Sequence, residues 1–447
     1  MRILIFTQHF APETAATGRR ALDLAESLAG RGHEVTVLTG VPNHPSSLGR
    51  PFCQRVPRRE VAAAGYSVVR VPVFRSEDTR PLHRLLTYAT FTLSAAWTGL
   101  HQPRPDVILA VSPLPTGLAA LPAHWMRGAP LVFDLQDIWP DSALAVGVMQ
   151  PRLALRLLRR LERFFYRRCA LIVSITEGFR RYLIQLGTEP ARVAVIHNGV
   201  DWKAFGTGPA DPEFRRSHGL DGKFVVGYVG NIGLAQGLAT LLDAADALRT
   251  SPVKFLLVGE GTDKARLQKL AHIQGLANVE FPEGVPRERV APILASCDAL
   301  LLILRRDLLF EITIPSKLYE YMAAGKPILC SVGGEAAGLV ASALCGLPLE
   351  PSDGAALARA VEKLREDTVL CKEMGCRGKC CARERFSRES LMADYAESVE
   401  DLVPAERRHA FPYNLRAGRD AGFQKTRRLL AGHLLRIFSL VFWLLSW

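Results

Sequence analysis

Short aliphatic runs recur along the chain, and stretches with a helical spacing of apolar residues lie between them. A strand of a parallel sheet is buried on both faces, so a near-continuous aliphatic run is typical of such a strand. We predict a first series of strands at Ile3–Phe6, Val35–Leu38, Val68–Val73, Val107–Val111, Leu131–Phe133, Leu171–Ser174 and Val193–Ile196. A second series follows at Val225–Val229, Phe255–Val258, Val279–Phe281, Ala299–Leu304 and Ile328–Cys330.

Helices are expected between these strands, for example at Arg19–Arg31 and Ala235–Leu248. Alternation of strands and helices predicts an α/β fold with parallel sheets. The turn signal Asn198-Gly199 falls between the two series. We therefore expect residues 1–198 and 199–387 to form two doubly wound, Rossmann-like domains. They should face a cleft, with a ligand at the carboxyl ends of their strands.

The composition fits a folded, cytosolic protein with an anionic partner. The 447 residues are 48% hydrophobic and 22% charged, which excludes a disordered or fibrous chain. The net charge of +12 favours a phosphorylated ligand or an acidic lipid surface. Nothing resembles a zinc finger or an RNA-binding motif, so we expect no nucleic acid partner. The nine cysteines lack paired C-x2-C spacing, which indicates a reduced protein without a metal site.

The loop after the first predicted strand is a candidate acceptor site. It contains His9 and Glu13 and reaches Gly18 at the start of the next helix. Backbone N–H groups at such a place can hold an anion or an acceptor. The alternative is a plain connector with a tight glycine turn.

Two glycine-rich loops follow strands of the second series. Gly230-Asn231-Ile232-Gly233 precedes a helix, and Gly259-Glu260-Gly261 ends the next strand. Glycines let the backbone approach a diphosphate or a nucleoside closely, and a helix N-terminus supplies partial positive charge. The alternative is that these glycines serve only turns and tight packing.

The stretch Ile314–Pro327 carries the most specific pattern. Pro315 can start a helix and Gly325 can end it. Lys317 and Glu320 are three residues apart, so they share one face of that helix. We expect Lys317 to meet a phosphate and Glu320 to accept hydrogen bonds from a ribose diol. An ordinary surface Lys–Glu pair is the alternative, although apolar residues fill most other positions.

With these motifs and the stretch Asp134–Ser142, the chain resembles glycosyltransferase family 4 over residues 1 to about 400. The similarity is to the branch of N-acetyl-L-fucosamine transferases of surface-polysaccharide synthesis. It implies GT-B architecture and a retaining transferase that needs no metal or other cofactor. It also implies a nucleotide-diphosphate sugar donor on the second domain. A helix at residues 388–403 is expected to cross back onto the first domain, which leaves residues 404–447 as a separate tail.

The resemblance also implies roles for individual residues. The candidate catalytic residues are Lys317, Glu320 and Asp137, with Asp137 and His9 as orienting groups and no general base assigned. We expect the acceptor near His9, Glu13 and Gly18. The residues expected to bind the donor are Gly230, Asn231, Gly233, Gly259, Gly261, Ile314, Ser316 and Leu318.

The sequence departs from the family pattern at three places. Ile312 stands where members often carry a glutamate that touches the donor sugar, and Glu311 is displaced from it by one residue. Asn231 and Gln236 replace a basic pair, and Gln136 replaces a histidine. The charge that meets the phosphates is then expected from Lys317, with Arg305 or Arg306.

Three segments suggest contact with a membrane. Arg152–Arg168 carries seven arginines with Leu and Phe at helical spacing, which is typical of a helix on anionic lipid; a solvated charged face is the alternative. Leu85–Leu100 is uncharged but too short to span a bilayer, so a helix that dips into the membrane and a buried helix are the two alternatives. Leu429–Trp447 contains Arg436, which favours an interfacial anchor over a span. Because the first apolar run is too short for a signal peptide, we expect a cytoplasmic protein at the inner face of the cytoplasmic membrane.

The leading hypothesis is a transferase that moves a hexose or N-acetylhexosamine from a nucleotide sugar to a lipid-linked or glycan acceptor. Two alternatives share the architecture. One is a nucleotide-sugar 2-epimerase, whose soluble substrates have no use for basic surfaces that face a membrane. The other is a degenerate GT-B protein that only binds or scaffolds a polysaccharide complex.

Overall fold

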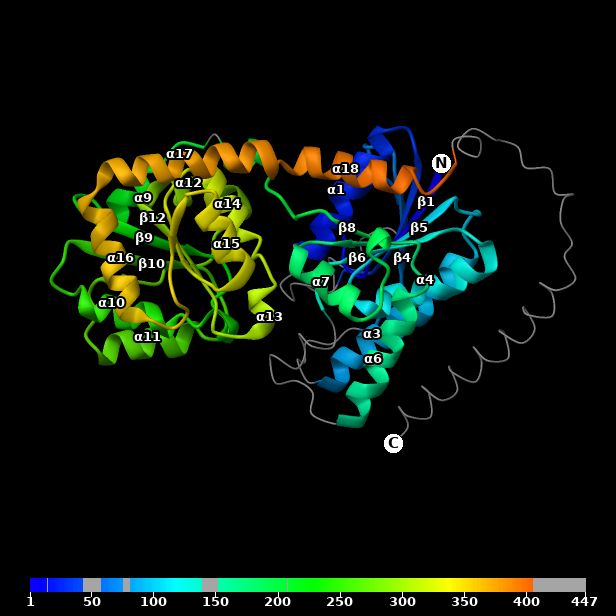
Figure 1. The fold of residues 1–447 in the computed structure, drawn as a ribbon, viewed down its shortest axis with the longest axis horizontal. Helices are drawn as coiled ribbons and strands as arrows, with labels where there is room; N and C mark the ends of the chain where they lie inside the picture. The colour runs from blue at the N-terminus through cyan, green and yellow to red at the C-terminus, as the bar shows by residue number, and fades with distance from the viewer. Residues whose placement is uncertain (14, 43–57, 75–80, 139–151, 207, 405–447) are drawn as a thin grey trace, which may run out of the picture.

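The computed structural model describes residues 1–13, 15–42, 58–74, 81–138, 152–206 and 208–404. Within these ranges the chain forms two α/β domains that lie side by side, each with helices packed on its sheet (Figure 1). A long helical stretch runs along one side of both domains and joins them. The arrangement confirms the predicted fold class.

The first domain is built on an eight-stranded sheet with the order β3-β4-β2-β1-β5-β6-β7-β8. Its neighbours are parallel except for the antiparallel pair β3 and β4. The strands are β1 (Arg2–Phe6), β2 (Glu34–Gly40), β3 (Arg59–Val61), β4 (Ser67–Val71), β5 (Val107–Val111), β6 (Leu131–Leu135), β7 (Leu171–Ser174) and β8 (Val193–Val195). The helices are α1 (Ala16–Gly30), α3 (Pro81–Leu100), α4 (Leu114–Arg127), α6 (Arg152–Tyr166) and α7 (Glu177–Gln185).

The second domain is built on a six-stranded parallel sheet with the order β11-β10-β9-β12-β13-β14. Its strands are β9 (Phe224–Val229), β10 (Val253–Val258), β11 (Val279–Glu280), β12 (Ala299–Ile303), β13 (Ile328–Ser331) and β14 (Gly346–Pro348). The first helices are α8 (Trp202–Phe205), α9 (Pro212–Ser217), α10 (Ala239–Ala247), α11 (Lys264–Ile273), α12 (Arg287–Ser296) and α13 (Leu308–Glu311). They are followed by α14 (Lys317–Ala324), α15 (Gly334–Ser342), α16 (Gly354–Glu366), α17 (Thr368–Arg385) and α18 (Arg388–Glu400).

All the predicted strands are present, and two further strands, β3 and β14, lie at sheet edges. These two escaped prediction because each has only three residues and a polar or proline-containing sequence, as edge strands often do. The helix predicted from Ala235 begins at Ala239 instead. A 3-10 turn at Leu234–Gln236 precedes it, and Gly237 ends that turn in the left-handed conformation with φ 62°.

Apolar side chains fill both faces of each sheet. In β1, Leu4 and Phe6 enter one core layer, whereas Ile3 and Ile5 enter the opposite layer. This alternation follows from the two-residue period of a strand. Burying a side chain of this size stabilises the fold by about 1.5–3 kcal/mol, so the aliphatic runs that predicted the strands also supply the core.

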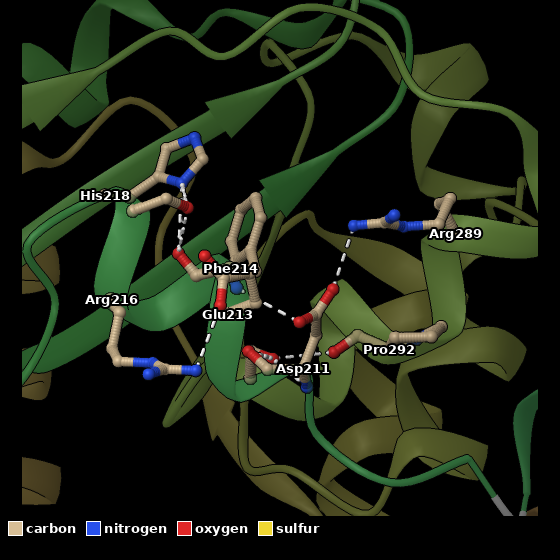
Figure 2. Close-up of polar contacts among 9 residues, drawn as sticks. Asp211, Glu213, Phe214, Arg216, His218, Arg289 and Pro292 are labelled. Carbon is tan, nitrogen blue, oxygen red and sulfur yellow. Dashed lines mark hydrogen bonds and ion pairs between the residues drawn. The ribbon is translucent and has the colours of Figure 1, made fainter.

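Asp211 fixes the start of α9 in the second domain. Its carboxylate accepts a hydrogen bond from the Phe214 N–H at 3.0 Å and so caps α9. The other carboxylate oxygen lies 2.9 Å from the guanidinium of Arg289 on α12 (Figure 2). Because these contacts join the segment before α9 to α12, they help to hold in place the helix that begins with Arg287.

The chain passes between the domains twice, and the two crossings are hydrogen-bonded to each other. The Val200 N–H donates to the Phe386 carbonyl at 2.8 Å, and the Arg388 N–H donates to the Val200 carbonyl at 3.0 Å. After the second crossing, α18 packs on α1, and its Tyr395 is completely buried in the core of the first domain. At the far end of this helix, Glu400 lies 2.8 Å from Arg31.

Candidate functional site

A pocket of about 340 Å³ lies between the two domains. The first domain contributes the loop after β1, including Glu13, and the first turns of α1 from Gly18 onward. The second domain contributes Arg287 at the start of α12, and Ser316 and Glu320 at the start of α14. Residues from both chain crossings complete the lining, among them Asn198, Gly199 and Arg388.

The strand order of each sheet explains why loops from both domains are available here. In the first sheet, β1 leads through β2 toward one edge, whereas β5 begins the half that extends toward the other edge. The strands β9 and β12 have the same relationship in the second sheet. At such a switch point the loops diverge and leave a crevice at the carboxyl ends of the strands. The loop after β1 and the loop at Gly230–Gly233 occupy these two positions.

The predicted acceptor-side residues come together on the first domain. His9 Nδ1 lies 3.0 Å from the carboxylate of Glu13, which is buried. Gly18 lies where α1 touches this loop, and a Cβ at that position would approach the His9 carbonyl to 3.1 Å. Close packing therefore accounts for the glycine, while the position still lines the pocket.

A cluster of two arginines and one aspartate forms part of the pocket wall. Arg19 Nε lies 2.9 Å from one oxygen of Asp23, and Arg388 Nε lies 3.3 Å from the other. Burial raises the pKa of the Asp23 carboxyl, and the two arginines partly offset this. With Asp23 ionised, the cluster carries one net positive charge, which favours an anionic ligand.

Arg20 ties the pocket to the rest of the first domain. Its guanidinium, which is only 4% exposed, donates to the Asp134 carboxylate at 2.9 Å. It also donates to the carbonyls of His197 at 2.9 Å and Ile196 at 3.0 Å, just before the first crossing. The Tyr395 ring of α18 lies 5.5 Å from its guanidinium carbon. Removing one partner of such a buried pair costs about 3–5 kcal/mol, so Arg20 fixes the crossing relative to β6 and α18.

Glu320 lies in the pocket beside Arg287. One Glu320 carboxylate oxygen is 3.0 Å from the Arg287 guanidinium. The Glu320 side chain is 16% exposed and that of Arg287 is 54% exposed. The Arg287 guanidinium carbon also lies 5.3 Å from the centroid of the Phe205 ring. The mostly buried carboxylate of Glu320 is thus paired with a cation whose own side chain is about half exposed.

Lys317 turns away from this pocket toward β9. Its ammonium donates to the Tyr228 hydroxyl at 2.5 Å and lies 3.9 Å from the centroid of that ring. A Cβ at Gly230 would come within 2.7 Å of Lys317 Nζ. Burial lowers the pKa of Lys317 to about 8, and the charge of Glu320 partly offsets this. The two charges expected on one helix face therefore reach two neighbouring places, the Gly230 loop and the interdomain pocket.

The backbone of the Gly230–Gly233 loop is already engaged within the protein. The Gly230 N–H donates to the Val258 carbonyl at 2.9 Å, and the Ile232 N–H donates to the Glu260 carbonyl at 2.8 Å. The Gly233 N–H donates to the side-chain oxygen of Gln236 at 3.0 Å. These three amides are occupied here, so Lys317 is the group of this loop region that is best placed to meet a phosphate.

Packing also explains the glycines after β10. A Cβ at Gly259 would lie 2.0 Å from the Gly230 carbonyl oxygen, and one at Gly261 would lie 2.2 Å from the Ile232 carbonyl oxygen. The two glycine-rich loops thus pack backbone against backbone. Of the two readings that the sequence left open for Gly259 and Gly261, the structure gives direct support to close packing.

The other residues predicted to bind the donor differ in their exposure to solvent. Ile314 and Leu318 are 6% and 0% exposed and belong to the core of the second domain, so only their backbone can face a ligand. Ser316 is exposed and lines the pocket. Asn231 is exposed and accepts a hydrogen bond from the Tyr228 hydroxyl on its carbonyl at 2.6 Å.

Asp137 and the two predicted arginines also do not line the interdomain pocket. Asp137 is exposed, two residues beyond the end of β6, and residues 139–142 of the same motif lie outside the described residues. Arg305 and Arg306 line a second pocket of about 450 Å³ with Gly333 and Gly334. The structure therefore does not bring these arginines together with Glu320.

Ile312, one of the residues that depart from the family pattern, lies at a second contact between the domains. The Thr176 hydroxyl donates to the Ile312 carbonyl at 2.7 Å, and the Ile312 side chain packs against the core of the first domain. A Cβ at Gly178 would approach Ile312 Cβ to 2.5 Å. Nearby, Arg181 lies 2.9 Å from Glu335 of α15. An apolar residue suits this position because it joins the two domains.

Sequence reasoning assigned no role to Arg20, Arg287, Arg388 or Tyr228, because each acquires its role from residues far away in the chain. Tyr228 did leave a signal, since a buried strand that carries a hydroxyl needs a partner for it. Arg20 lies two residues after Gly18. Arg287 and Arg388 carry no local signal, and only the folded chain places them in the pocket.

The described residues contain no group of three or more histidine, cysteine or acidic side chains arranged to hold a metal ion. In the same part of the chain, none of the helices combines the length and apolar character needed to cross a bilayer. The predicted tail segment Leu429–Trp447 lies outside the described residues.

Two helices of the first domain expose apolar residues, and on α6 these lie among arginines. On α3, Leu93 and Trp97 are 42% and 68% exposed, while Phe91 on the opposite face is buried. On α6, Leu157 and Phe164 are exposed and lie among arginines. Phe165 on the same helix is buried. The exposed arginines of the described part of this helix and its end are Arg156, Arg159, Arg160, Arg163, Arg167 and Arg168.

Family models match most of both domains. Residues 16–199 match the glycosyl transferase 4-like domain, and residues 210–379 match the glycosyl transferases group 1 domain. The putative colanic acid biosynthesis glycosyl transferase WcaI of Escherichia coli K12 is 30% identical over 73% of this chain and 82% of its own. The probable glycosyltransferase WbjE of Pseudomonas aeruginosa is 28% identical over 74% of this chain and 83% of its own.

Solved structures share the fold at lower identity. HepE of Anabaena in complex with UDP-glucose is 21% identical with a TM-score of 0.67, over 90% of this chain and 100% of its own. WaaG, a glycosyltransferase involved in lipopolysaccharide biosynthesis, is 19% identical with a TM-score of 0.63, over 89% of this chain and 99% of its own. These likenesses establish the two-domain GT-B architecture.

Proposed function

Because this chain belongs to the glycosyltransferase family that combines a 4-like domain with a group 1 domain, we propose that it transfers a sugar from a nucleotide diphosphate to a lipid-linked glycan. The sugar is a hexose or an N-acetylhexosamine, and the product belongs to a bacterial surface polysaccharide. Two relatives support this setting by their names, WcaI in colanic acid biosynthesis and WaaG in lipopolysaccharide biosynthesis. We expect retention of the anomeric configuration, which the family resemblance implies.

The observation that carries the proposal is the pocket between the domains, where Glu320 and Ser316 face the loop after β1. A transferase has to hold donor and acceptor together, and only an interdomain site lets two Rossmann-like domains contribute to one reaction. The bound UDP-glucose of HepE supports a nucleotide sugar as the donor.

The charges suggest how the donor binds. Glu320 accepts hydrogen bonds from the ribose diol once Arg287 moves aside or shares the carboxylate. Lys317, one turn earlier on α14, meets the diphosphate at the Gly230 loop. As the bond between sugar and phosphate breaks, negative charge grows on the diphosphate, and a fixed ammonium stabilises that charge. The net positive cluster of Arg19, Asp23 and Arg388 adds to the field that attracts an anion.

No metal ion has a part in this scheme, as the family resemblance implies. Lys317 supplies the charge that a metal would otherwise supply to the leaving diphosphate. The acceptor lies on the first domain beside His9, Glu13 and Gly18. Asp137, two residues beyond the end of β6, is proposed as an orienting group, with no general base assigned.

We further propose that the enzyme works at the inner face of the cytoplasmic membrane as a peripheral protein. A lipid-linked acceptor is confined to that surface, so the enzyme gains from binding it. The exposed arginines of α6, with Leu157 and Phe164 among them, combine attraction to anionic lipid with apolar contact. Trp97 and Leu93 of α3 add further exposed apolar surface on the same domain.

The test is a donor screen with purified full-length protein, first by thermal shift and then by transfer. A nucleotide sugar at about a hundred times its Kd should stabilise the protein by about 2.7 kcal/mol. Release of nucleoside diphosphate that depends on added membrane lipid extract is the expected second result. Conversion of the donor sugar to its epimer without transfer would replace the proposal with an epimerase. Binding without turnover would leave a scaffold protein.

A further inference from the structure

Tyr228 is the residue of β9 that meets the ammonium of Lys317. The phenol oxygen accepts a hydrogen bond from Lys317 Nζ at 2.5 Å. The same hydroxyl donates its proton to the carbonyl of Asn231 at 2.6 Å. A single hydroxyl therefore joins the lysine of α14 to the backbone of the loop that follows β9.

We propose that Tyr228 is a positioning residue that holds the Lys317 ammonium at the Gly230 loop, where the donor diphosphate arrives. The inference rests on the proposed function, because it takes a nucleoside diphosphate as the ligand of Lys317. Tyr228 itself touches neither the sugar nor the phosphate and acts only through Lys317.

The geometry favours a tyrosine over other residues at this position. A phenol hydroxyl can accept from an ammonium and donate to a carbonyl at the same time, whereas a second carbonyl could only accept. The ring adds a face over which the ammonium lies 3.9 Å from the centroid, a cation–π contact. Both interactions are stronger with the charged form of Lys317, so they stabilise the ammonium that phosphate binding requires.

Space at the loop restricts the lysine in the same way. A Cβ at Gly230 would lie 2.5 Å from Lys317 Cε and 2.7 Å from Nζ. The lysine end therefore fits only because residue 230 is glycine. Tyr228 holds the ammonium on one side and Gly230 leaves room for it on the other, so a small movement brings it from the phenol to a phosphate.

The proton affinity of Lys317 reflects these surroundings. The titratable groups set against it are the Tyr228 hydroxyl on β9 and the Glu320 carboxylate on α14, with the Tyr321 hydroxyl close behind Tyr228. Burial lowers the pKa of Lys317 to about 8. Loss of the Tyr228 hydroxyl removes an acceptor from the charged form and should lower this pKa further. Diphosphate binding should raise it.

The experiment measures binding of UDP and of GDP to full-length protein by calorimetry between pH 7.5 and 9.5. Over this range the phosphates, whose last pKa is about 6, stay fully ionised. Each titration is repeated in a second buffer of different ionisation enthalpy, so the number of protons taken up on binding is obtained. The variants are Tyr228→Phe, which keeps the ring, Lys317→Met, and Tyr321→Phe as control.

Wild type should bind one of the diphosphates with proton uptake near pH 8, and its affinity should fall as pH rises. Tyr228→Phe should weaken binding by about tenfold at pH 7.5 and move the loss of affinity to lower pH. Lys317→Met should abolish the proton uptake. Tyr321→Phe removes a buried hydroxyl that accepts from the Val229 N–H at 3.2 Å. It should lower thermal stability but leave the pH at which affinity falls unchanged.

Two outcomes would overturn the inference while the proposed function stands. One is a Tyr228→Phe variant with wild-type affinity and an unshifted pH dependence. The other is wild-type affinity in Lys317→Met, which would remove the lysine from the donor site. Failure of the wild type to bind any nucleoside diphosphate or nucleotide sugar would instead overturn the proposed function and this inference with it.

Discussion

The carboxylate of Glu320 lies 3.0 Å from the guanidinium of Arg287, although the two residues come from different helices of the second domain. Both line the pocket between the domains. The pair places a carboxylate at the start of α14 where a ribose can reach it, and gives it a partner in the absence of donor. The role of Glu320 in donor binding can be tested separately from its role in the ion pair with Arg287.

We predict that Glu320→Gln lowers kcat/KM by about tenfold to a hundredfold, the loss expected for a charge-assisted hydrogen bond. The melting temperature should change little, because the amide keeps the shape. Arg287→Ala is the matched control and should cost much less, since ribose replaces the arginine when the donor binds. Equal losses in the two variants would mean that Glu320 acts through its ion pair and not through the donor.

Lys317→Ala should also cripple transfer, and in the wild type the KM for the donor should rise as pH passes through about 8, where Lys317 loses its proton. Stability should respond in the opposite sense. The pKa of Lys317 lies below its ordinary value of 10.5, so the unfolded chain binds this proton more tightly. Below pH 8 the buried charge therefore destabilises the fold. Lys317→Met should melt no lower than wild type at pH 7, and a clear drop in its melting temperature would contradict this account.

Transfer should persist in EDTA at the wild-type rate. The scheme assigns the neutralisation of the leaving diphosphate to Lys317, and the sequence has no Asp-x-Asp motif in a loop after a strand. Rates are compared before and after chelation, and then with added magnesium or manganese. Activity lost in EDTA and restored by either ion would show that a metal does the work we assign to the lysine.

Gly259→Ala should destabilise the second domain by about 1–3 kcal/mol or more, as overpacking does. The new Cβ would lie 2.0 Å from the Gly230 carbonyl oxygen, which is backbone and cannot turn away. The control is Gly338→Ala on α15, where a Cβ meets nothing within 4 Å. That change should stabilise by about 0.4–1 kcal/mol. Thermal melts of both variants decide the matter, and similar melting temperatures would refute the packing argument.

Full-length protein should bind vesicles that contain anionic lipid, by two attractions of different kinds. Each arginine near the surface contributes about 1 kcal/mol, screened within roughly 10 Å at moderate salt. Truncation after Val403 should leave weak binding that salt reverses. In that truncated protein, the double variant Arg156→Gln with Arg160→Gln should bind less.

The matched control for those charges is Arg359→Gln with Arg377→Gln on the second domain, which should bind vesicles as before. Neutralising the α6 arginines in the full chain should leave salt-insensitive binding through the tail at Leu429–Trp447. If the full-length chain ignores anionic vesicles at low salt, the membrane proposal fails. The assignment as a glycosyltransferase would survive, with a soluble acceptor.

The sequence by itself determined that this protein consists of parallel sheets covered by helices on both faces. Runs such as Ile3–Phe6 and Val225–Val229 are apolar on both faces, and only a strand buried on both sides satisfies that pattern. Gly325 ends α14 with φ 69°, as its position after an apolar helix predicted. The stretch around Lys317 and Glu320 was also recognisable, because charges in an apolar helix need a reason.

Only the tertiary structure decided which partner each site residue has. Helical spacing puts Lys317 and Glu320 on one face of α14. In the folded chain, however, Lys317 contacts Tyr228 of β9 and Glu320 contacts Arg287 of α12. The sequence favoured a phosphate site at Gly230 and left Gly259 open between a ligand site and a turn. In the structure, Lys317 limits the space at Gly230, and the Gly230 carbonyl limits the space at Gly259. Such contacts join residues that are 29 or more positions apart in the chain. Local preferences along a sequence set strands and helices, whereas the relative placement of distant charges follows from the order of the strands in each sheet and the packing of helices on it.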